Sequence, residues 1–474
     1  MIPIRNATDV ARANLCHGCG ACTYACSDGR LQMHDFVAHG LRPVFVDVDA
    51  VETGSGRAAG QGAAGGLTVT GAAATVSATA SAFIAAGPTD ACASCNDCVT
   101  VCPGLGIDHA PAWAMSGTLD ALRESWGPVL EVWEGFATDG ALRRAGSSGG
   151  LASALALFAV QHQGMRGVLH VGADDEVRYL NASRFSRTPG ELLAATGSKY
   201  SPASPCDQLQ AIEDAGGSCV FVGKPCDVHG LRKAQKLRPA LDANVGLAIG
   251  IFCAGTPSTQ GTLDLLAQHG VDADQVAEVR YRGRGWPGLF SVRMKDEGGE
   301  PGEGGWRDLA TYAEAWGFLQ KYRPFRCHLC PDGTSEFADL SCGDPWYREI
   351  AEGEAGRSLL LVRTETGRRM VRAAVAAGVL SLEAVSPDVL LMSQRELQRK
   401  RGAIWGRLLT LRMAGIAAPR YTGFSLFGNW LRIPLGHQLR SLVGTARRIV
   451  ARGYARGVVL EPPRATPPLE GPAS

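Results

Sequence analysis

Short apolar runs alternate with longer helical stretches from about Val129 onward. The alternation of strand and helix predicts an α/β domain with a mainly parallel sheet. A helix is predicted at Leu151–His162, directly after a Gly-rich turn, and another at the Ala-rich Arg369–Val379. The runs that predict buried strands are Gly167–Gly172, Ser218–Gly223, Leu247–Cys253, Leu289–Met294 and Ser358–Val362.

The chain before Val129 has a different pattern. A strand-like segment at Leu41–Ala50 is followed by a Gly/Ala/Thr/Ser-rich stretch at 51–87, which predicts a flexible insertion. The fold class is therefore α/β, or α+β overall. We divide the chain into an N-terminal module at 1–128, two parts of an α/β domain at 129–215 and 216–390, and a C-terminal tail at 391–474.

Composition is that of a globular protein with more than one domain. The chain has 474 residues, of which 45% are hydrophobic and 20% charged, with a formal net charge of +1. The first residues contain no apolar signal core, and no uncharged apolar run reaches the roughly 18 residues of a spanning helix. We therefore expect a cytoplasmic protein.

Positive charge is concentrated in the tail. Residues 395–456 contain 13 Lys or Arg and one acidic residue, Glu396, so the rest of the chain carries −11. From Ile404 to Arg452, apolar residues interleaved with Arg predict an amphipathic helix on the inner face of a membrane or on an acidic partner. Packing of the tail on its own acidic body is the alternative. No nucleic-acid motif accompanies the charge, and Glu461–Ser474 is predicted to be disordered.

Two tight cysteine runs carry the most specific signal. Each has the C-x2-C-x2-C-x3-C spacing of bacterial two-cluster ferredoxins, in which the fourth cysteine of each run binds the other cluster. Structural zinc is disfavoured because zinc sites lack this doubled spacing. Gly18 and Gly20 leave room for backbone N–H groups beside the sulfurs. The spacing predicts two [4Fe-4S] clusters, one on Cys16, Cys19, Cys22 and Cys102 and the other on Cys92, Cys95, Cys98 and Cys26.

Four of the remaining cysteines could hold a third cluster. Cys327 and Cys330 have metal-ligand spacing, and Cys226 and Cys253 lie in Gly-containing loops. The alternative is that they bind no metal. Cys206 is interpreted as a small buried hydrophobic residue, as is Cys219.

Polar loops that follow predicted strands indicate a cofactor site at one edge of the sheet. A phosphate would suit the backbone N–H groups at the start of the Leu151–His162 helix, although a simple helix cap is the alternative. Lysine and arginine in nearby loops could add positive charge, or could be ordinary surface residues. The candidate cofactor-binding residues are Ser147, Ser148, Gly149, Gly150, Lys199, Tyr200, Lys224 and Arg232.

These segments resemble the coenzyme F-420 hydrogenase/dehydrogenase beta-subunit family. The resemblance covers about residues 1–365 and rests on SSGG (147–150), GSKYSP (197–202), VGKPCDVHGLRK (222–233), IFCAGTPS (251–258) and CHLCPDGTSEFADLSCGDPW (327–346). It implies an FAD-binding α/β fold and an additional cluster on Cys226, Cys253, Cys327 and Cys330. The basic tail is similar to relatives encoded near polysaccharide biosynthesis genes.

The resemblance implies an iron–sulfur flavoprotein oxidoreductase. Reduced ferredoxin or a partner subunit would supply electrons, and FAD would pass a pair to a small-molecule acceptor. Lys224, Asp227 and His229 are the candidate proton donors, although His229 could equally be a core histidine. The alternatives are a subunit that reduces or oxidises coenzyme F-420 and a non-catalytic electron-transfer adaptor.

Overall fold

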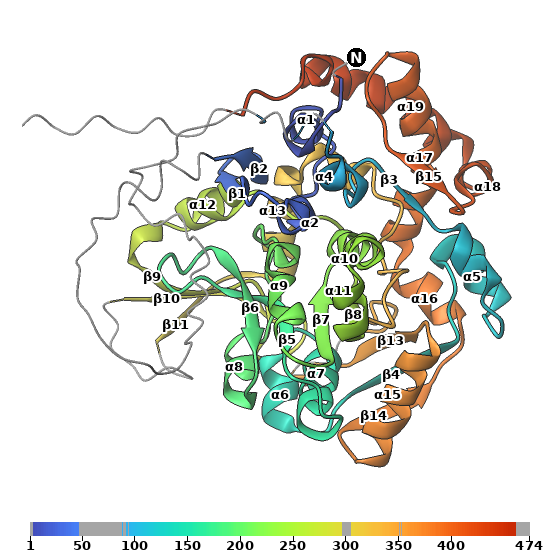
Figure 1. The fold of residues 1–474 in the computed structure, drawn as a ribbon. Helices are drawn as coiled ribbons and strands as arrows, with labels where there is room; N and C mark the ends of the chain where they lie inside the picture. The colour runs from blue at the N-terminus through green and yellow to red at the C-terminus, as the bar shows by residue number, and fades with distance from the viewer. Residues whose placement is uncertain are drawn as a thin grey trace, which may run out of the picture.

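The chain combines an N-terminal ferredoxin-like module, a mixed α/β body and a set of C-terminal helices (Figure 1). The computed structural model describes residues 3–46, 88, 92, 94–295, 305–349, 351 and 353–460. The predicted insertion at 51–87 and the predicted disordered end at 461–474 lie outside the described residues.

The body is built on one sheet with the strand order β14-β4-β13-β12-β8-β7-β5-β6. Because strands from 129–215 and 216–390 join in this sheet, the two predicted parts form one α/β unit. The strands are β4 Glu131–Ala137, β5 Val168–Ala173, β6 Asn181–Ser186, β7 Cys219–Gly223, β8 Val245–Ile251, β12 Leu340–Gly343, β13 Ser358–Val362 and β14 Leu380–Ala384.

Only the centre of this sheet is parallel. Strands β12, β8, β7 and β5 pair in parallel, whereas the outer strands β13, β4, β14 and β6 pair antiparallel. The prediction of a mainly parallel sheet is therefore wrong for the outer strands. A parallel neighbour needs a crossover of a dozen or more residues. The link from β5 to β6 has only about seven residues, so β6 returns antiparallel to β5.

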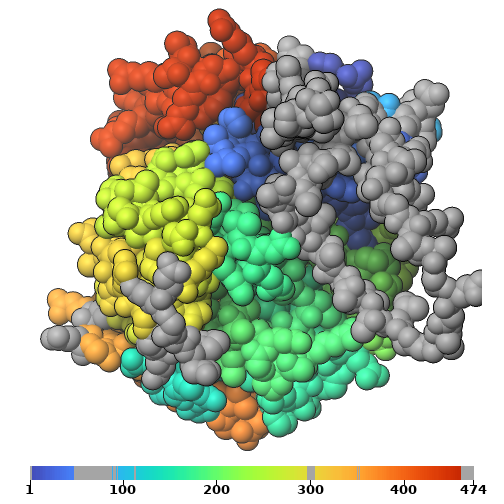
Figure 2. Space-filling view, turned by 90° about the vertical axis from the view of Figure 1, so that its left-hand side faces the viewer, coloured from blue at the N-terminus to red at the C-terminus, as the bar shows by residue number. Residues whose placement is uncertain are grey.

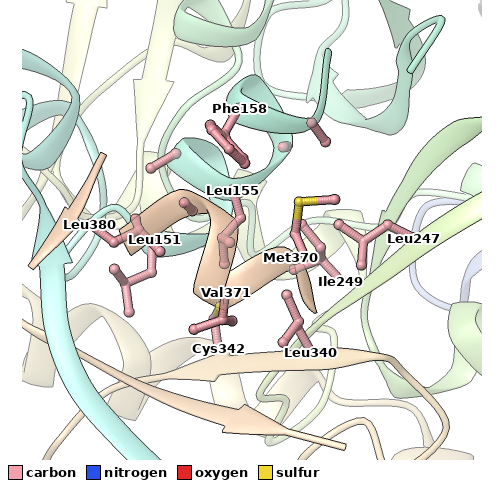
Figure 3. Close-up of a cluster of buried hydrophobic side chains, with 14 of the residues drawn as sticks. Leu151, Leu155, Phe158, Leu247, Ile249, Leu340, Cys342, Met370, Val371 and Leu380 are labelled. Atoms are coloured by element: carbon pink, nitrogen blue, oxygen red, sulfur yellow. The ribbon is translucent and has the colours of Figure 1, made fainter. Parts of the chain in front are cut away.

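Two helices cover the first face of the sheet. α7 (Leu151–His162) and α15 (Glu365–Ala376) pack there. α7 has the predicted bounds, whereas α15 begins four residues before and ends three residues before the predicted 369–379. Figure 3 shows Leu155 and Phe158 of α7 with Met370 and Val371 of α15 over strand residues such as Ile249. α6 (Gly140–Ala145) and α8 (Pro189–Ala194) flank them. The parallel strands are buried on both faces, which explains their nearly continuous apolar sequence.

The second face carries the N-terminal module. Ala21 and Tyr24 of α2 (Ala21–Ala25) share one apolar core with Phe221 of β7 and Val228 and Leu231 of α10. The cysteine-bearing module is thus held directly against the α/β body. The other helices on this side are α9 Gln210–Glu213, α10 Pro225–Leu237 and α11 Pro239–Asn244.

The module itself is small. Its strands β1 (Leu31–Phe36) and β2 (Gly40–Phe45) form an antiparallel hairpin, so the first half of the predicted strand at 41–50 is confirmed. Its remaining elements are α1 Ala7–Arg12, α4 Asp97–Thr100, β3 Gly106–Asp108 and α5 Asp120–Trp126.

A second, antiparallel sheet has the order β11-β10-β9 and packs against α12 and α13. The predicted strand Leu289–Met294 is β10 and lies in this sheet rather than in the main one. The elements are β9 Val276–Arg280, β10 Leu289–Met294, β11 Trp306–Thr311, α12 Thr259–Gln268, α13 Tyr312–Leu319 and the short α14 Phe325–His328.

The C-terminal helices pack on the N-terminal module, beside which they form the top of the molecule in Figure 2. Ile404 and Leu408 of α17 share a core with Val10 and Leu15, and β15 pairs in parallel with β3. Helix α17 therefore packs on the rest of the chain, which is the alternative given above for the basic tail. The elements are α16 Asp388–Ser393, α17 Arg395–Met413, β15 Arg420–Thr422, α18 Leu426–Arg432 and α19 Leu435–Ala451. Within the described ranges, no helix combines the length and apolarity needed to cross a membrane.

Candidate functional site

The structure brings together the four cysteines predicted to bind the first cluster. Cys16 and Cys19 lie in the loop before α2, Cys22 lies in its first turn, and Cys102 follows α4. Burial raises the pKa of the Cys102 thiol to about 12, and repulsion from Cys16 and Cys19 adds to the shift. Burial and repulsion from Cys16, Cys19 and Cys102 raise the pKa of Cys22 as well.

The second set of four is also assembled across the two runs. Burial, with repulsion from Cys95, Cys26 and Cys92, raises the pKa of Cys98. Cys95 is exposed, so this group lies at the surface. Cys22 packs beside Cys26 and Cys98, which places the two groups next to each other. The interleaved arrangement is the one that the doubled spacing predicts.

Glycines shape the first cysteine loop. The Gly18 N–H donates to Cys16 Sγ at 3.2 Å, as expected around a cluster sulfur. Gly18 has φ +74°, and a Cβ there would lie 2.6 Å from the Leu41 carbonyl oxygen. Gly20 has φ +86°, and its Cβ would lie 2.6 Å from the Asp207 nitrogen. Only glycine fits at either position, so the loop can hold its sulfurs close to the backbone.

A third group forms where the α/β body meets the module. Cys226 lies in the first turn of α10, Cys253 follows β8, and Cys327 and Cys330 lie around α14. Burial raises the pKa of Cys253 to about 11, and repulsion from Cys327 and Cys330 contributes. Burial also raises the pKa of Cys226, and repulsion from Cys253 and Cys19 contributes. The donor set fits a four-iron cluster beside the first cysteine group.

The described residues include no three His, Cys, Asp or Glu side chains that converge on one metal ion. A [4Fe-4S] cluster does not need such convergence, because each of its irons takes one thiolate. Cys206 and Cys219 are completely buried. The Cys206 thiol hydrogen-bonds to Cys19 of the first group, whereas Cys219 stands outside the three groups. Cys342 lies on β12, and burial alone raises its pKa to about 12.

A cavity of about 810 Å³ opens at the carboxyl ends of β7, β8 and β12. Its volume lies in the range of cofactor sites, and its place at this edge agrees with ligand binding in open α/β sheets. Cys253 lines it too, so the third cysteine group borders the cavity. The sequence-predicted residues that line it are Ser147, Ser148, Gly150, Lys199, Tyr200, Lys224 and Asp227.

The Ser/Gly loop before α7 is held rigidly at the cavity. Ser147 Oγ accepts a hydrogen bond from the Ser198 N–H at 2.6 Å. The Gly149 N–H donates to Ser358 Oγ at 2.8 Å and is therefore engaged within the protein. Gly150 adopts φ +75° as the N-cap of α7. Leu151 also lines the cavity, so the N-terminus of this twelve-residue helix faces it.

Lys199 supplies a half-buried positive charge. Burial, with repulsion from Arg280, lowers the pKa of its ammonium group to about 8. Within the described residues its Nζ has one hydrogen bond, to the Thr196 carbonyl at 3.4 Å. An anion in the cavity would relieve this desolvation, which fits the phosphates of a dinucleotide.

Lys224 and Asp227 form a second charged feature of the wall. Lys224 Nζ donates to both Asp227 oxygens at 2.8 Å and to the Ala203 carbonyl at 3.1 Å. Burial alone would lower the pKa of Lys224, but Asp227 raises it above its usual value. Lys224 therefore stays protonated beside Cys253.

Three predicted site residues are not part of the cavity lining: Gly149, whose N–H is bound to Ser358, and two residues of α10. His229 is buried, with Nε2 2.9 Å from Asp332 Oδ2 and its ring against Phe337. Arg232 donates to the Phe337 carbonyl and to Asp339, each at 3.0 Å. The structure therefore brings neither side chain to the cavity.

Sequence reasoning missed the aromatic wall of the cavity. The rings of Tyr312 and Trp346 stack with 5.3 Å between centroids and 3° between planes. Arg282 lies over both rings and pairs with Asp344. Gly343 ends the short strand β12, which was not among the predicted strands, and Asp344 and Trp346 follow it. These residues lie at the carboxyl end of a strand, where ligands bind in open α/β sheets, and this position was the signal that could have identified them.

This combination defines the class of protein. A doubled ferredoxin arrangement is fused to an α/β sheet, whose carboxyl edge carries further cysteines and a cofactor-sized cavity. The chain is an iron–sulfur oxidoreductase.

Family models match the chain as coenzyme F-420 hydrogenase/dehydrogenase beta subunit N-term (residues 132–210) and C terminus (residues 217–388), and as a 4Fe-4S dicluster domain (residues 12–105). The chain belongs to the coenzyme F-420 hydrogenase/dehydrogenase beta-subunit family.

Curated proteins of similar sequence include subunits and enzymes named for coenzyme F-420. The coenzyme F-420 hydrogenase subunit beta of Methanococcus voltae is 27% identical over 281 residues, which are 56% of this chain and 89% of that protein. The coenzyme F-420-dependent sulfite reductase of Methanocaldococcus jannaschii is 25% identical over 346 residues, 65% of this chain and 50% of that protein. Among solved structures, a chain of the F-420-reducing [NiFe] hydrogenase complex from Methanosarcina barkeri aligns with a TM-score of 0.47 and 21% identity, covering 60% of this chain and 94% of that one.

Proposed function

We propose that this chain is an iron–sulfur flavoprotein that takes single electrons from ferredoxin or a partner subunit and delivers pairs to a two-electron acceptor. When bound, FAD would supply the exchange between one-electron and two-electron steps. The observation that carries the proposal is the position of Cys253, which belongs to the third cysteine group and also lines the large cavity.

The three cysteine groups are arranged as a route from the surface to that cavity. The group with exposed Cys95 is the outermost and is where a donor protein would dock. Cys22 joins it to the first group. Cys16 and Cys327 line one small cavity together with Lys224, so the first and third groups are neighbours. Each group is thus adjacent to the next.

The chain offers suitable residues for each part of FAD. The N-terminus of α7 and the ammonium of Lys199 would receive phosphates. The stacked rings of Tyr312 and Trp346 offer an apolar face to a planar ring system. Lys224, protonated and hydrogen-bonded to Asp227, is the cavity group best placed to hold a proton near Cys253.

Coenzyme F-420 is the favoured acceptor, because the matched hydrogenase subunit and the matched sulfite reductase are both named for it. A small molecule of polysaccharide metabolism is the second candidate, on the similarity of the basic tail. The non-catalytic adaptor is disfavoured by the size of the cavity, which an adaptor does not need.

Anaerobic assays of the FAD-reconstituted protein test the proposal. With reduced ferredoxin as donor, the absorbance of F-420 should fall over many turnovers. The matched variant with Cys327→Ser and Cys330→Ser should lose this activity. Flavin reduction without F-420 turnover would move the assignment to another acceptor, and failure to bind flavin would favour the adaptor.

A further inference from the structure

The outer face of α18 and α19 is apolar and open to solvent. Six aliphatic or aromatic residues of these two helices are between 50% and 83% exposed, and large exposed apolar patches on soluble proteins mark interaction sites. They are Phe427, Leu431, Leu435, Leu439, Val443 and Val450. We refer to them as the apolar face.

Helix geometry shows that this face is separate from the one that anchors α19. At about 100° per residue, Leu435, Leu439, Val443 and Val450 fall within about 80° of arc. Ser441, Thr445 and Ile449 lie on a different arc and are buried. Ser441 Oγ, for example, meets Trp430 Nε1 of α18 at 3.1 Å. The helix therefore has one apolar side for packing and another facing outward.

Basic and aromatic residues border the apolar face. Arg440 and Arg447 project beside its arc and are exposed. Trp405 packs against Phe427 and Trp430, with ring centroids 4.9 and 4.6 Å apart. Apolar, aromatic and basic side chains in this order are typical of helices that lie in the headgroup region of a bilayer.

We propose that the apolar face binds the surface of an anionic lipid membrane, with α18 and α19 lying parallel to it. Charge complementarity selects this occupant, because residues 435–456 carry four exposed arginines and no acidic residue, and anionic lipids attract such segments. A second copy of the chain would bring two positively charged faces together and be repelled. The proposal does not depend on the electron-transfer function.

Vesicle co-sedimentation of the full chain tests it. Binding to vesicles containing phosphatidylglycerol should exceed binding to phosphatidylcholine alone by at least tenfold and should weaken with added salt. Leu439→Glu with Val443→Glu should abolish binding. Each of Arg440→Ala and Arg447→Ala should weaken it about fivefold. Val375→Glu, at a partly exposed position of α15, should change nothing.

Equal binding to both kinds of vesicle, or unchanged binding of the Leu439/Val443 variant, would overturn the proposal. So would a dimer in solution that the same variant dissociates while the wild type ignores vesicles, since the face would then contact a second copy. Retention of the cluster absorbance by the variant establishes that it is folded.

Discussion

Arg282 and Asp344 form a bidentate ion pair on the wall of the large cavity. Arg282 Nη1 lies 2.9 Å from Asp344 Oδ2, and Nη2 lies 2.7 Å from Oδ1. The same guanidinium is 4.6 Å from the ring centroid of Tyr312 and 5.4 Å from that of Trp346. Asp344 therefore fixes the cation around which the aromatic wall is organised.

Asp344→Asn should lower both stability and flavin retention. Removing one partner of a buried pair leaves an uncompensated charge, which costs about 3–5 kcal/mol. Thermal unfolding and flavin content after gel filtration measure the two effects. Asp175→Asn is the matched control, because its pair with Arg184 at 2.6 Å is largely exposed and should be worth less than about 1 kcal/mol. Equal effects of the two variants would contradict the assignment.

The Cys327→Ser, Cys330→Ser variant should lose about four irons per chain, since both thiolates of one cluster are removed. Iron analysis and electron paramagnetic resonance of the reduced protein measure the loss. Cys219→Ser is the control, because that buried thiol donates to the Gly217 carbonyl and stands outside the three groups. Unchanged iron in the double variant would show that these cysteines hold no cluster.

His170 should make the protein less stable in acid. Its Nε2 lies 2.7 Å from Ser186 Oγ, and burial lowers its pKa from 6.5 to about 4. Between these values the unfolded chain binds a proton that the folded chain does not. The free energy of unfolding therefore falls as pH decreases through this window, by at most about 3 kcal/mol.

The midpoint of thermal unfolding, measured from pH 7 to about pH 4.5, checks this dependence. His170→Gln should flatten the acid side of the profile, whereas His162→Gln at the exposed end of α7 should leave it as in the wild type. Parallel profiles for wild type and His170→Gln would refute the role given to His170.

Arg401 should anchor the C-terminal helices. Its Nη1 pairs with buried Glu336, and its Nη2 donates to the carbonyls of Glu124 and Phe424 at 3.1 and 3.2 Å. Burial raises the pKa of Glu336 to about 7, and Arg401 opposes that rise.

The Arg401→Met substitution should lower the free energy of unfolding by about 3–5 kcal/mol and open α17 to limited proteolysis. Arg399→Met, in the same helix but exposed with Glu396, should behave as wild type; a similar loss there would contradict the anchor.

The elements best predicted from the sequence are those whose own periodicity is strong. Helix α7 has the predicted bounds, and β7 and β10 agree within a residue. For β7 the reason is that burial on both faces of the parallel centre demands continuous apolar residues. Of the outer strands, β13 was predicted with its exact bounds, whereas β4, β6 and β14 were not predicted. The antiparallel pairing of these strands was not predicted, since pairing direction depends on connections that a local pattern does not contain. The interleaving of Cys26 with the second run followed from spacing alone.

The cavity was predicted less well. Ser147, Lys199 and Lys224 lie in glycine-containing loops and do line it. His229 and Arg232 belong to the same segment, but helix α10 directs them elsewhere. Arg282 and Trp346 are far from those loops in sequence. Only the assembled sheet edge and the neighbouring antiparallel sheet bring them to the cavity.

Three cysteine groups that lead to a flavin fix the iron, sulfide and flavin content of the chain. Anaerobic purification, followed by measurement of iron, acid-labile sulfide and flavin per chain, determines this content. We expect about twelve irons, about twelve sulfides and one FAD, since each [4Fe-4S] cluster contributes four irons and four sulfides. About eight irons and no flavin after reconstitution would contradict this expectation.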